Sequence, residues 1–255
     1  GKIYEVPLTK QNQYLPNLES IPVEIYQKTK IFLVNYPNSP TGAIATKEFY
    51  AQLLKKAKQY GFLIVNDCVY GPLTYHTEPL SIFSIPDSEN YCIEVHSLSK
   101  AFNMTGFRIG FMVANEKLMH ILKEVKDNMD SGQYIPIQYA AMKAFENETQ
   151  TLPQLKEHYY RRLTQVASIL NKHHLHCKVP EATFYLYVQI PSTFKTAEDF
   201  ALYLLYQAGI YTIPWDEAEP AVRFAMTYPI QTTEHDFLVE LDRRLSHLSF
   251  FEKKE

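Results

Sequence analysis

Short apolar, β-branched runs alternate with an amphipathic stretch in the first half of the chain, and this pattern constrains the fold most. The strand-like runs are KIFLVN (30–35), FLIVND (62–67), YCIEVHS (91–97) and IGFMVA (109–114). A helical run, TKEFYAQLLKKAKQYG (46–61), lies between the first two, with Thr46 in the N-cap position and Gly61 at the C-terminal stop. Strands that alternate with helices predict an α/β layer on a largely parallel sheet.

The second half of the chain follows a different pattern. Helical periodicity runs from Asn115 to about Lys172, with an interruption at 131–136 and a last long run that begins near Leu152. The expected elements after it are a strand pair (182–190), a helix (197–209), a strand (221–228) and a helix capped near Thr233. We therefore expect a large domain over residues 1–150 and a small α+β domain over residues 151–255.

The composition of the 255 residues argues against several classes of function. Hydrophobic residues make up 46% of the chain, and the net charge is −3 with no window dense in Lys and Arg, so nucleic acid is not an expected partner. No apolar run approaches the roughly 20 residues of a membrane span, and no signal-peptide core opens the chain, which predicts a cytoplasmic protein without a membrane partner. The cysteines Cys68, Cys92 and Cys177 lack the spacing of a zinc site or a disulfide framework, so no metal is expected.

A lysine, two serines and an arginine are grouped in the segment HSLSKAFNMTGFRIGF (96–111). A phosphate dianion needs hydroxyl donors and a guanidinium, which Ser97, Ser99 and Arg108 supply. An aldehyde carbon needs an amine, which Lys100 supplies. The group therefore suits a phosphorylated aldehyde, although each residue taken alone is also typical of a solvated loop.

Asp67 ends the apolar strand FLIVND, where an unpaired carboxylate is costly. A protonated pyridine nitrogen would give it a cationic partner, and Tyr70 could bond a ring hydroxyl. Asp67, Ser97 and Lys100 all fall at the carboxyl ends of expected parallel strands, where ligands bind in such sheets. The alternatives are a turn residue for Asp67 and simple packing for Tyr70.

Arg223 lies within the apolar strand AVRFAM and is costly there unless it meets an anion. A substrate carboxylate would satisfy its guanidinium in bidentate fashion. The alternative is that the side chain extends to an exposed edge of the sheet.

The chain resembles the fold-type I, pyridoxal-phosphate-dependent aminotransferases of class I/II. The resemblance is carried, in order, by YPNSPTG (36–42), NDCVY (66–70), SLSKAFNMTGFRIG (97–110) and AVRFAMT (221–227). FNMTGFRIG, DSGQYIPIQ (130–138) and EATFYLYV (181–188) look most like LL-diaminopimelate and related aspartate or alanine aminotransferases. The resemblance implies a parallel-sheet large domain that binds pyridoxal 5′-phosphate, a small C-terminal domain, and a homodimer.

The resemblance also implies a role for each matching residue. Lys100 is the Schiff-base lysine and the catalytic residue. Asp67 pairs with the pyridine nitrogen, and Tyr70 bonds the ring hydroxyl. The remaining roles are phosphate binding by Ser97, Ser99 and Arg108, and binding of the substrate carboxylate by Arg223.

Two departures from the family pattern stand out. Ser39 replaces the Asn that usually gives the ring hydroxyl a second donor, and its side chain is shorter; it stays among the cofactor-binding candidates. Gly1 matches a point after the N-terminal third of a family member, and that third carries the glycine-rich phosphate turn, the aromatic that stacks on the ring, and the arm over the substrate. A fragment, a naturally truncated relative and one piece of a split enzyme are all open at this point.

The expected function is transfer of an amino group between an amino acid and a 2-oxo acid. Two alternatives remain on the same scaffold, because the cofactor supplies the reactivity and the fold positions it. One is a pyridoxal-phosphate-dependent lyase. The other is an aminotransferase-like domain without catalysis.

Overall fold

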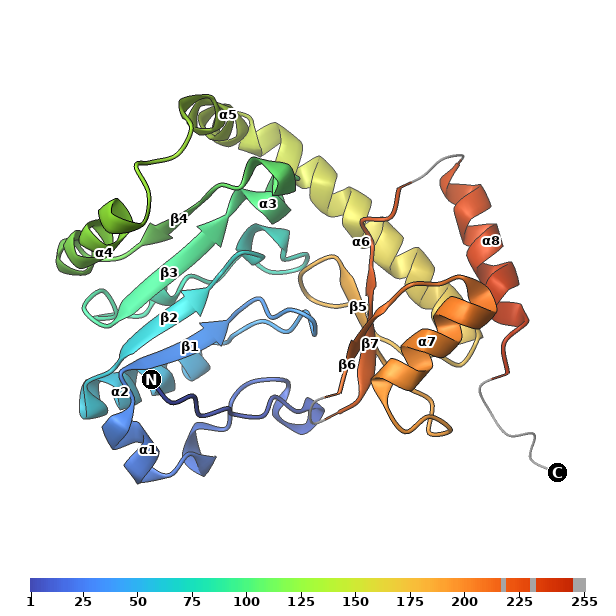
Figure 1. The fold of residues 1–255 in the computed structure, drawn as a ribbon, viewed down its shortest axis with the longest axis horizontal. Coiled ribbons are helices and arrows are strands. Elements are labelled where there is room, and N and C mark those ends of the chain that lie inside the picture. Colours follow the sequence, from blue (N-terminus) through green and yellow to red (C-terminus); the bar gives the residue numbers. More distant parts are fainter. Residues whose placement is uncertain (217–218, 230–232, 250–255) are drawn as a thin grey trace.

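The computed structural model describes residues 1–216, 219–229 and 233–249, and its first sheet has four strands (Figure 1). Their order in the sheet is β1-β2-β3-β4. The first three are parallel and β4 is antiparallel to β3, so the predicted α/β layer with a mainly parallel sheet is confirmed. The bounds are β1 Ile31–Asn35, β2 Leu63–Asp67, β3 Cys92–Ser97 and β4 Gly110–Val113.

Helix α2 (Lys47–Tyr60) joins β1 to β2 and packs on this sheet. The Thr46 hydroxyl accepts the Phe49 N–H at 3.1 Å, and Gly61 ends the helix in a left-handed conformation, as the sequence predicts. One face of α2 is buried in the core, which explains why a charged sequence forms a stable helix there. Helix α1 (Val23–Lys28) precedes β1, and the short α3 (Leu98–Ala101) follows β3 directly.

Three helices connect the two sheets: α4 (Glu116–Met129), α5 (Ile135–Glu146) and α6 (Glu148–Lys172). Helix α6 begins at Glu148, earlier than the expected start near Leu152. Pro153 lies inside it and cannot donate a backbone hydrogen bond, so the helical pattern is recognisable in the sequence only from about that residue onward. Because α6 runs through Thr151, the division at residues 150 and 151 stays a prediction.

The second sheet has the order β5-β7-β6 and is antiparallel, as expected for an α+β unit. Helices α6, α7 and α8 share one hydrophobic core with it. The Thr233 hydroxyl accepts the Asp236 N–H at 3.1 Å, which confirms the predicted cap of the last helix. The bounds are β5 Tyr185–Gln189, β6 Ile213–Trp215, β7 Ala221–Ala225, α7 Ala197–Ala208 and α8 Glu234–Ser246.

The carboxyl end of β2 reaches the second sheet. Tyr70 and Leu73, which follow β2, belong to the same buried core as β5 and β7. An isolated antiparallel bridge joins Thr74 to Ala182, just before β5. The end of the parallel sheet therefore faces β5 and β7 (Figure 1).

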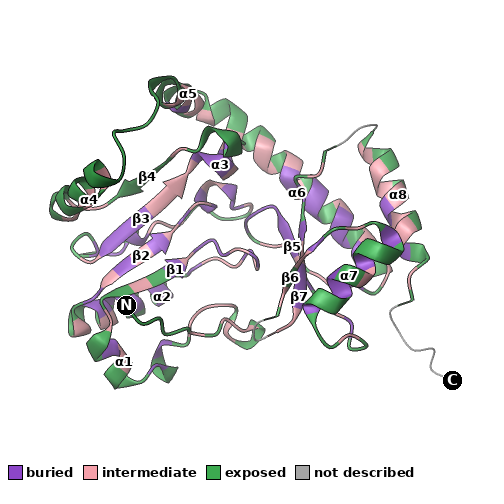
Figure 2. Ribbon diagram, viewed as in Figure 1, coloured by how far each residue is buried: buried purple, intermediate pink, exposed green. Residues whose placement is uncertain are grey.

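The two edge strands of the first sheet are the exposed ones (Figure 2). All four residues of β4 are exposed. On β1, Ile31 is 61% exposed and Leu33 is 68% exposed, whereas β2 and β3 are mainly buried or half-buried. In the part of the chain that the structure describes, no helix is long and apolar enough to cross a membrane.

Candidate functional site

Lys100 lies in α3, immediately after the carboxyl end of β3. The Ser97 hydroxyl begins this helix by accepting the Ser99 N–H at 3.1 Å. Lys100 is half-buried, and its Nζ lies 5.8 Å from the centroid of the Tyr70 ring and 5.9 Å from that of Phe184. The fold thus holds an amine over two aromatic rings at the end of the parallel sheet.

Tyr70 comes three residues after β2 and packs edge-on against Phe184 and Tyr185, with ring centroids 5.8 and 5.9 Å away. The Tyr70 hydroxyl donates to the Tyr185 hydroxyl at 3.3 Å. Burial, and then the neighbouring Tyr185 hydroxyl, raise the pKa of Tyr70. Tyr70 therefore offers a neutral hydroxyl beside Lys100.

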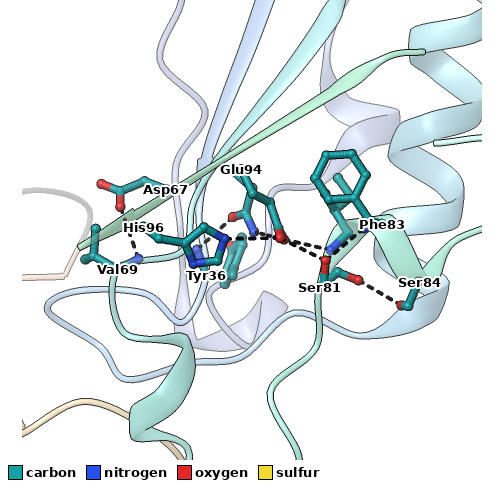
Figure 3. A network of polar contacts seen from close by, with 10 residues as sticks. Tyr36, Asp67, Val69, Ser81, Phe83, Ser84, Glu94 and His96 are labelled. Carbon is teal, nitrogen blue, oxygen red and sulfur yellow. Dashed lines mark hydrogen bonds and ion pairs between the residues drawn. The ribbon is translucent and has the colours of Figure 1, made fainter. Parts of the chain in front are cut away.

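Asp67 is the last residue of β2, and its backbone is fixed from both sides. The Asn35 side-chain amide donates to the Asp67 carbonyl at 2.8 Å. The Asp67 carboxylate accepts the Val69 N–H at 3.3 Å (Figure 3). Burial raises the pKa of Asp67. The hydrogen bond from the Val69 N–H and the positive charges of His96 and Lys100 lower this pKa, but burial has the larger effect. A cation bound against Asp67 would offset the cost of this burial.

Arg223 lies on β7 with its guanidinium over aromatic rings. Its Cζ is 4.2 Å from the centroid of the Tyr185 ring and 5.4 Å from that of Trp215. Its Nη1 donates to Ser39 Oγ at 3.4 Å, and Ser39 in turn donates its N–H to Asn35 Oδ1 at 2.9 Å. Arg223 Nε is buried without a hydrogen-bond partner among the described residues, so the guanidinium can still donate hydrogen bonds to an anion.

The three residues expected to bind phosphate lie around the start of α3. Ser97 pairs with Gly110 across β3 and β4, and Arg108 precedes Gly110 by two residues. The Arg108 guanidinium is exposed and donates to the Thr105 carbonyl at 2.8 Å. No hydrogen bond joins Arg108 to Ser97 or Ser99 in the described residues, so the fold brings the three near one another without linking them.

Gly110 has a packing reason to be glycine. A Cβ on this residue would lie 2.5 Å from the His96 carbonyl oxygen, which is closer than real Cβ atoms come. The absence of a side chain lets β4 approach β3 next to Ser97. The sequence explains this glycine only once the strand pairing is known.

The donor set fits pyridoxal phosphate on chemical grounds. The site combines an amine, a neutral phenol, a half-buried carboxylate and a guanidinium with an unmatched N–H, all contributed by Lys100, Tyr70, Asp67 and Arg223. Each of these groups has a counterpart in the cofactor or its substrate: an aldehyde, a ring hydroxyl, a ring nitrogen and a carboxylate. Within the described ranges, no three His, Cys, Asp or Glu side chains gather as a metal site.

Sequence reasoning missed several residues that shape the site, among them Glu94, His96 and Tyr185. Glu94 and His96 are two apart in the strand CIEVHS, so they share one face of β3. That spacing of a carboxylate and an imidazole within an apolar strand was a usable signal. Tyr185, by contrast, had no signal, because its partners Tyr70 and Arg223 come from distant parts of the chain.

Comparisons with known proteins agree on one family. The model of the family "aminotransferase class I and II" matches residues 1–235. The LL-diaminopimelate aminotransferase of Methanocaldococcus jannaschii is 42% identical over 260 residues, covering 96% of this chain and 62% of its own length. That of Methanococcus maripaludis is 38% identical over 263 residues, covering 98% and 63%.

Solved structures are similar as well. Apo-BacF from Bacillus subtilis has a TM-score of 0.88 and 32% identity, covering 95% of this chain and 64% of that chain. A probable N-succinyldiaminopimelate aminotransferase from Thermus thermophilus has a TM-score of 0.84 and 27% identity, covering 95% and 64%. The chain therefore spans slightly less than two thirds of the length of these relatives.

Proposed function

Since the chain belongs to the aminotransferase class I and II family and has the fold of the fold-type I enzymes, we propose that it is a pyridoxal-phosphate-dependent aminotransferase. The observation that supports this best is the position of Lys100, whose Nζ lies 5.8 Å from the Tyr70 ring beside the end of β2. The proposed reaction moves an amino group between an amino acid and a 2-oxo acid.

When bound, pyridoxal phosphate supplies a reactive aldehyde and a ring that accepts electrons. Lys100 would bind the aldehyde, and its free amine would later take the proton from the substrate α-carbon. Asp67 would keep a proton on the ring nitrogen by its negative charge. Tyr70, which has a neutral hydroxyl, would redirect its hydrogen bond from the Tyr185 hydroxyl to the ring hydroxyl, with Ser39 next to it.

The phosphate would lie at the start of α3, held by Ser97, Ser99 and Arg108. Ser97 and Ser99 already surround the first turn of that helix. Arg108 would have to exchange its bond to the Thr105 carbonyl for one to phosphate, which its exposed position allows. Phosphate binding here therefore requires the exposed Arg108 side chain to rotate.

Arg223 would bind the α-carboxylate of the substrate. The unmatched Nε supports this assignment, because a carboxylate would satisfy it together with an Nη group. The names of the relatives make LL-diaminopimelate the first substrate to test. We also propose a homodimer, since Met129 at the end of α4 and Tyr134 just before α5 are large apolar or aromatic side chains that are 76% and 71% exposed. The cytoplasmic location stays a prediction.

The test adds pyridoxal phosphate to the purified protein and records its absorbance. We expect a new absorbance band that disappears in Lys100→Ala, because a covalent bond between the aldehyde and an amine changes the cofactor spectrum and Lys100 is the proposed amine. Lys143→Ala is the matched control, since Lys143 is an exposed lysine of α5 paired with Glu146. A band of equal size in Lys100→Ala would contradict the proposal.

If the band forms, amino donors separate the reactions that the fold supports. L-glutamate or LL-diaminopimelate should bleach the band as the amino group moves to the cofactor, and a 2-oxo acid should restore it. Release of ammonia together with a 2-oxo acid, without restoration, would identify a lyase instead.

A further inference from the structure

Arg223 lies on β7, the middle strand of the second sheet, between β5 and β6. The register pairs it with Tyr187 on β5 and with Ile213 on β6. Side chains two residues away on these strands project from the same face of the sheet, and aromatic or long side chains in such diagonal positions can touch. The two diagonal positions beside Arg223 are occupied by Tyr185 and Trp215.

Both aromatic rings contact the Arg223 guanidinium. Its Cζ is 4.2 Å from the centroid of the Tyr185 ring and 5.4 Å from that of Trp215. Tyr185 is paired with Ala225 and Trp215 with Ala221, so the two rings approach Arg223 from opposite directions along β7. A guanidinium that stacks on an aromatic ring keeps the N–H groups of its own plane free to donate to a carboxylate.

The Tyr185 ring is itself held by its neighbours. Tyr185 is only 7% exposed, and its hydroxyl accepts from the Tyr70 hydroxyl at 3.3 Å. The rings of Tyr70 and Phe184 pack against it edge-on, with centroids 5.9 and 4.6 Å away. Because close packing on all these sides leaves a buried ring few orientations, the face of Tyr185 gives Arg223 a fixed platform.

The hydrogen bonds of Arg223 leave one edge of the guanidinium without a partner. Nη1 donates to Ser39 Oγ at 3.4 Å, whereas Nε is buried and has no partner among the described residues. Nη2 lies on the same edge as Nε, and the two parallel N–H groups of that edge match the two oxygens of a carboxylate. The rings and Ser39 therefore hold the guanidinium while its Nε edge remains available to a carboxylate.

We propose that Tyr185 is a positioning residue, whose ring holds the Arg223 guanidinium in the orientation that presents its Nε edge to a carboxylate. Trp215 supports the same orientation from β6. That this carboxylate belongs to an amino-acid substrate rests on the proposed function. The stacking, and its effect on the binding of a simple carboxylate, are properties of the chain without cofactor. Failure of the role of Tyr185 and failure of the proposed function can therefore be told apart.

The test follows the Nε–H signal of Arg223 by nitrogen-15 NMR in the cofactor-free protein, with the signal assigned by its loss in Arg223→Met. Propionate, a carboxylate without an amino group, is the probe. Tyr185→Leu removes the ring and keeps an apolar side chain. We expect the affinity for propionate to fall about tenfold in this variant, as loss of one desolvated contact between a cation and a ring predicts. An unchanged affinity in a folded Tyr185→Leu protein would overturn the proposal.

Tyr185→Phe keeps the ring and removes only the hydroxyl, so it should retain the affinity for propionate. A loss as large as that in Tyr185→Leu would assign the effect to the hydroxyl and would overturn the role of the ring.

Tyr228→Leu is the matched control. Tyr228 also stacks on an arginine at 4.2 Å, but this arginine is Arg162. The Arg223 signal and the affinity for propionate should not change in this variant. Equal losses of affinity in Tyr185→Leu and Tyr228→Leu would mean a general loosening of the region around the second sheet and would also overturn the proposal.

A second measurement does not require a Tyr185 variant to fold. In the unmodified chain, nuclear Overhauser effects should connect the Arg223 Nε–H to the ring protons of Tyr185, and they should persist when propionate binds and shifts the Nε–H signal. Their loss on binding would overturn the proposal, because the ring would then not hold the bound guanidinium.

The cofactor-loaded protein gives a third measurement. Tyr185→Leu should raise the KM for the amino acid and leave kcat nearly unchanged, since the carboxylate is bound in the ground state and in the transition state alike. A fall in kcat with an unchanged KM would contradict the proposal. If propionate binds as expected but no Lys100-dependent band forms, the proposed function fails while the role of Tyr185 stands.

Discussion

Arg162 and Arg223 place the same side chain in two regions of the C-terminal half, with different outcomes. Each stacks on a tyrosine, with Cζ 4.2 Å from the centroid of Tyr228 or of Tyr185. Arg162 donates to Glu234 and to the carbonyls of Met226 and Tyr228, at 2.8 and 3.1 Å. Arg223 donates only to Ser39 in the described residues and leaves Nε unmatched.

This difference separates an arginine that stabilises the fold from one that is available to a ligand. Buried donors in a finished fold are paired, because an unpaired one costs stability. Arg162 meets that condition and fixes the chain between β7 and α8. Arg223 does not meet it, and it stacks on Tyr185, whose hydroxyl accepts from Tyr70, so its unmatched donor is available to a ligand.

The largest expected effect is the loss of Arg162. Arg162→Ala leaves the Glu234 carboxylate and two carbonyls without their donor, and removing one partner of a buried pair costs about 3–5 kcal/mol. We expect urea unfolding to show that Arg162→Ala lowers the free energy of unfolding by that amount. Arg161→Ala is the control, because Arg161 donates to the same Glu234 at 2.8 Å but is 52% exposed. Arg161→Ala should lower the free energy of unfolding by less than about 1 kcal/mol. Equal losses of stability in the two variants would contradict the assignment of a special structural role to Arg162.

Arg223 should show the reverse behaviour. Arg223→Met removes an unpaired donor and keeps an apolar chain, so the free energy of unfolding should change by no more than about 1 kcal/mol. Affinity for an amino acid in the cofactor-loaded protein should fall about a hundredfold, as for a charged hydrogen-bonded pair of about 2–3 kcal/mol. Isothermal titration measures it, with the exposed Arg243→Met as control. Unchanged affinity would remove the carboxylate assignment.

The smallest effect is a pH dependence that belongs to the Arg162 region. Burial raises the pKa of Glu234, but hydrogen bonds from Arg162 and Arg161 outweigh it, so the pKa in the folded chain lies below the ordinary 4.5. A lowered pKa adds stability that is present above the unfolded pKa and is lost as the pH falls through the folded pKa. Stability should therefore decline in acid below about 4.5.

Unfolding curves measured across that acidic range should decline less steeply for Glu234→Gln than for the unmodified chain. The exposed Glu157→Gln of α6 serves as the control and should follow the unmodified chain. Parallel curves for Glu234→Gln and the unmodified chain would show that the contribution of the Arg162–Glu234 ion pair to stability does not change with pH in this range.

Much of the fold could be predicted from the sequence because it depends on local patterns. The four strands of the first sheet, the caps at Thr46 and Thr233, and the stop at Gly61 follow from hydrophobic period and side-chain chemistry over a few residues. The start of α6 could not be read, because Pro153 breaks the pattern inside a helix that tertiary packing stabilises.

The candidate site divides in the same way. The groups themselves could be predicted from the sequence: the amine of Lys100, the carboxylate of Asp67 and the guanidinium of Arg223, each in a recognisable motif. The packing of distant segments places Tyr185 between Tyr70 and Arg223, and it buries Glu94 among hydrogen-bond donors from Asn66, Ser81 and Ile82. These contacts join residues far apart in the chain, and the burial that fixes their charges exists only after the sheets have packed.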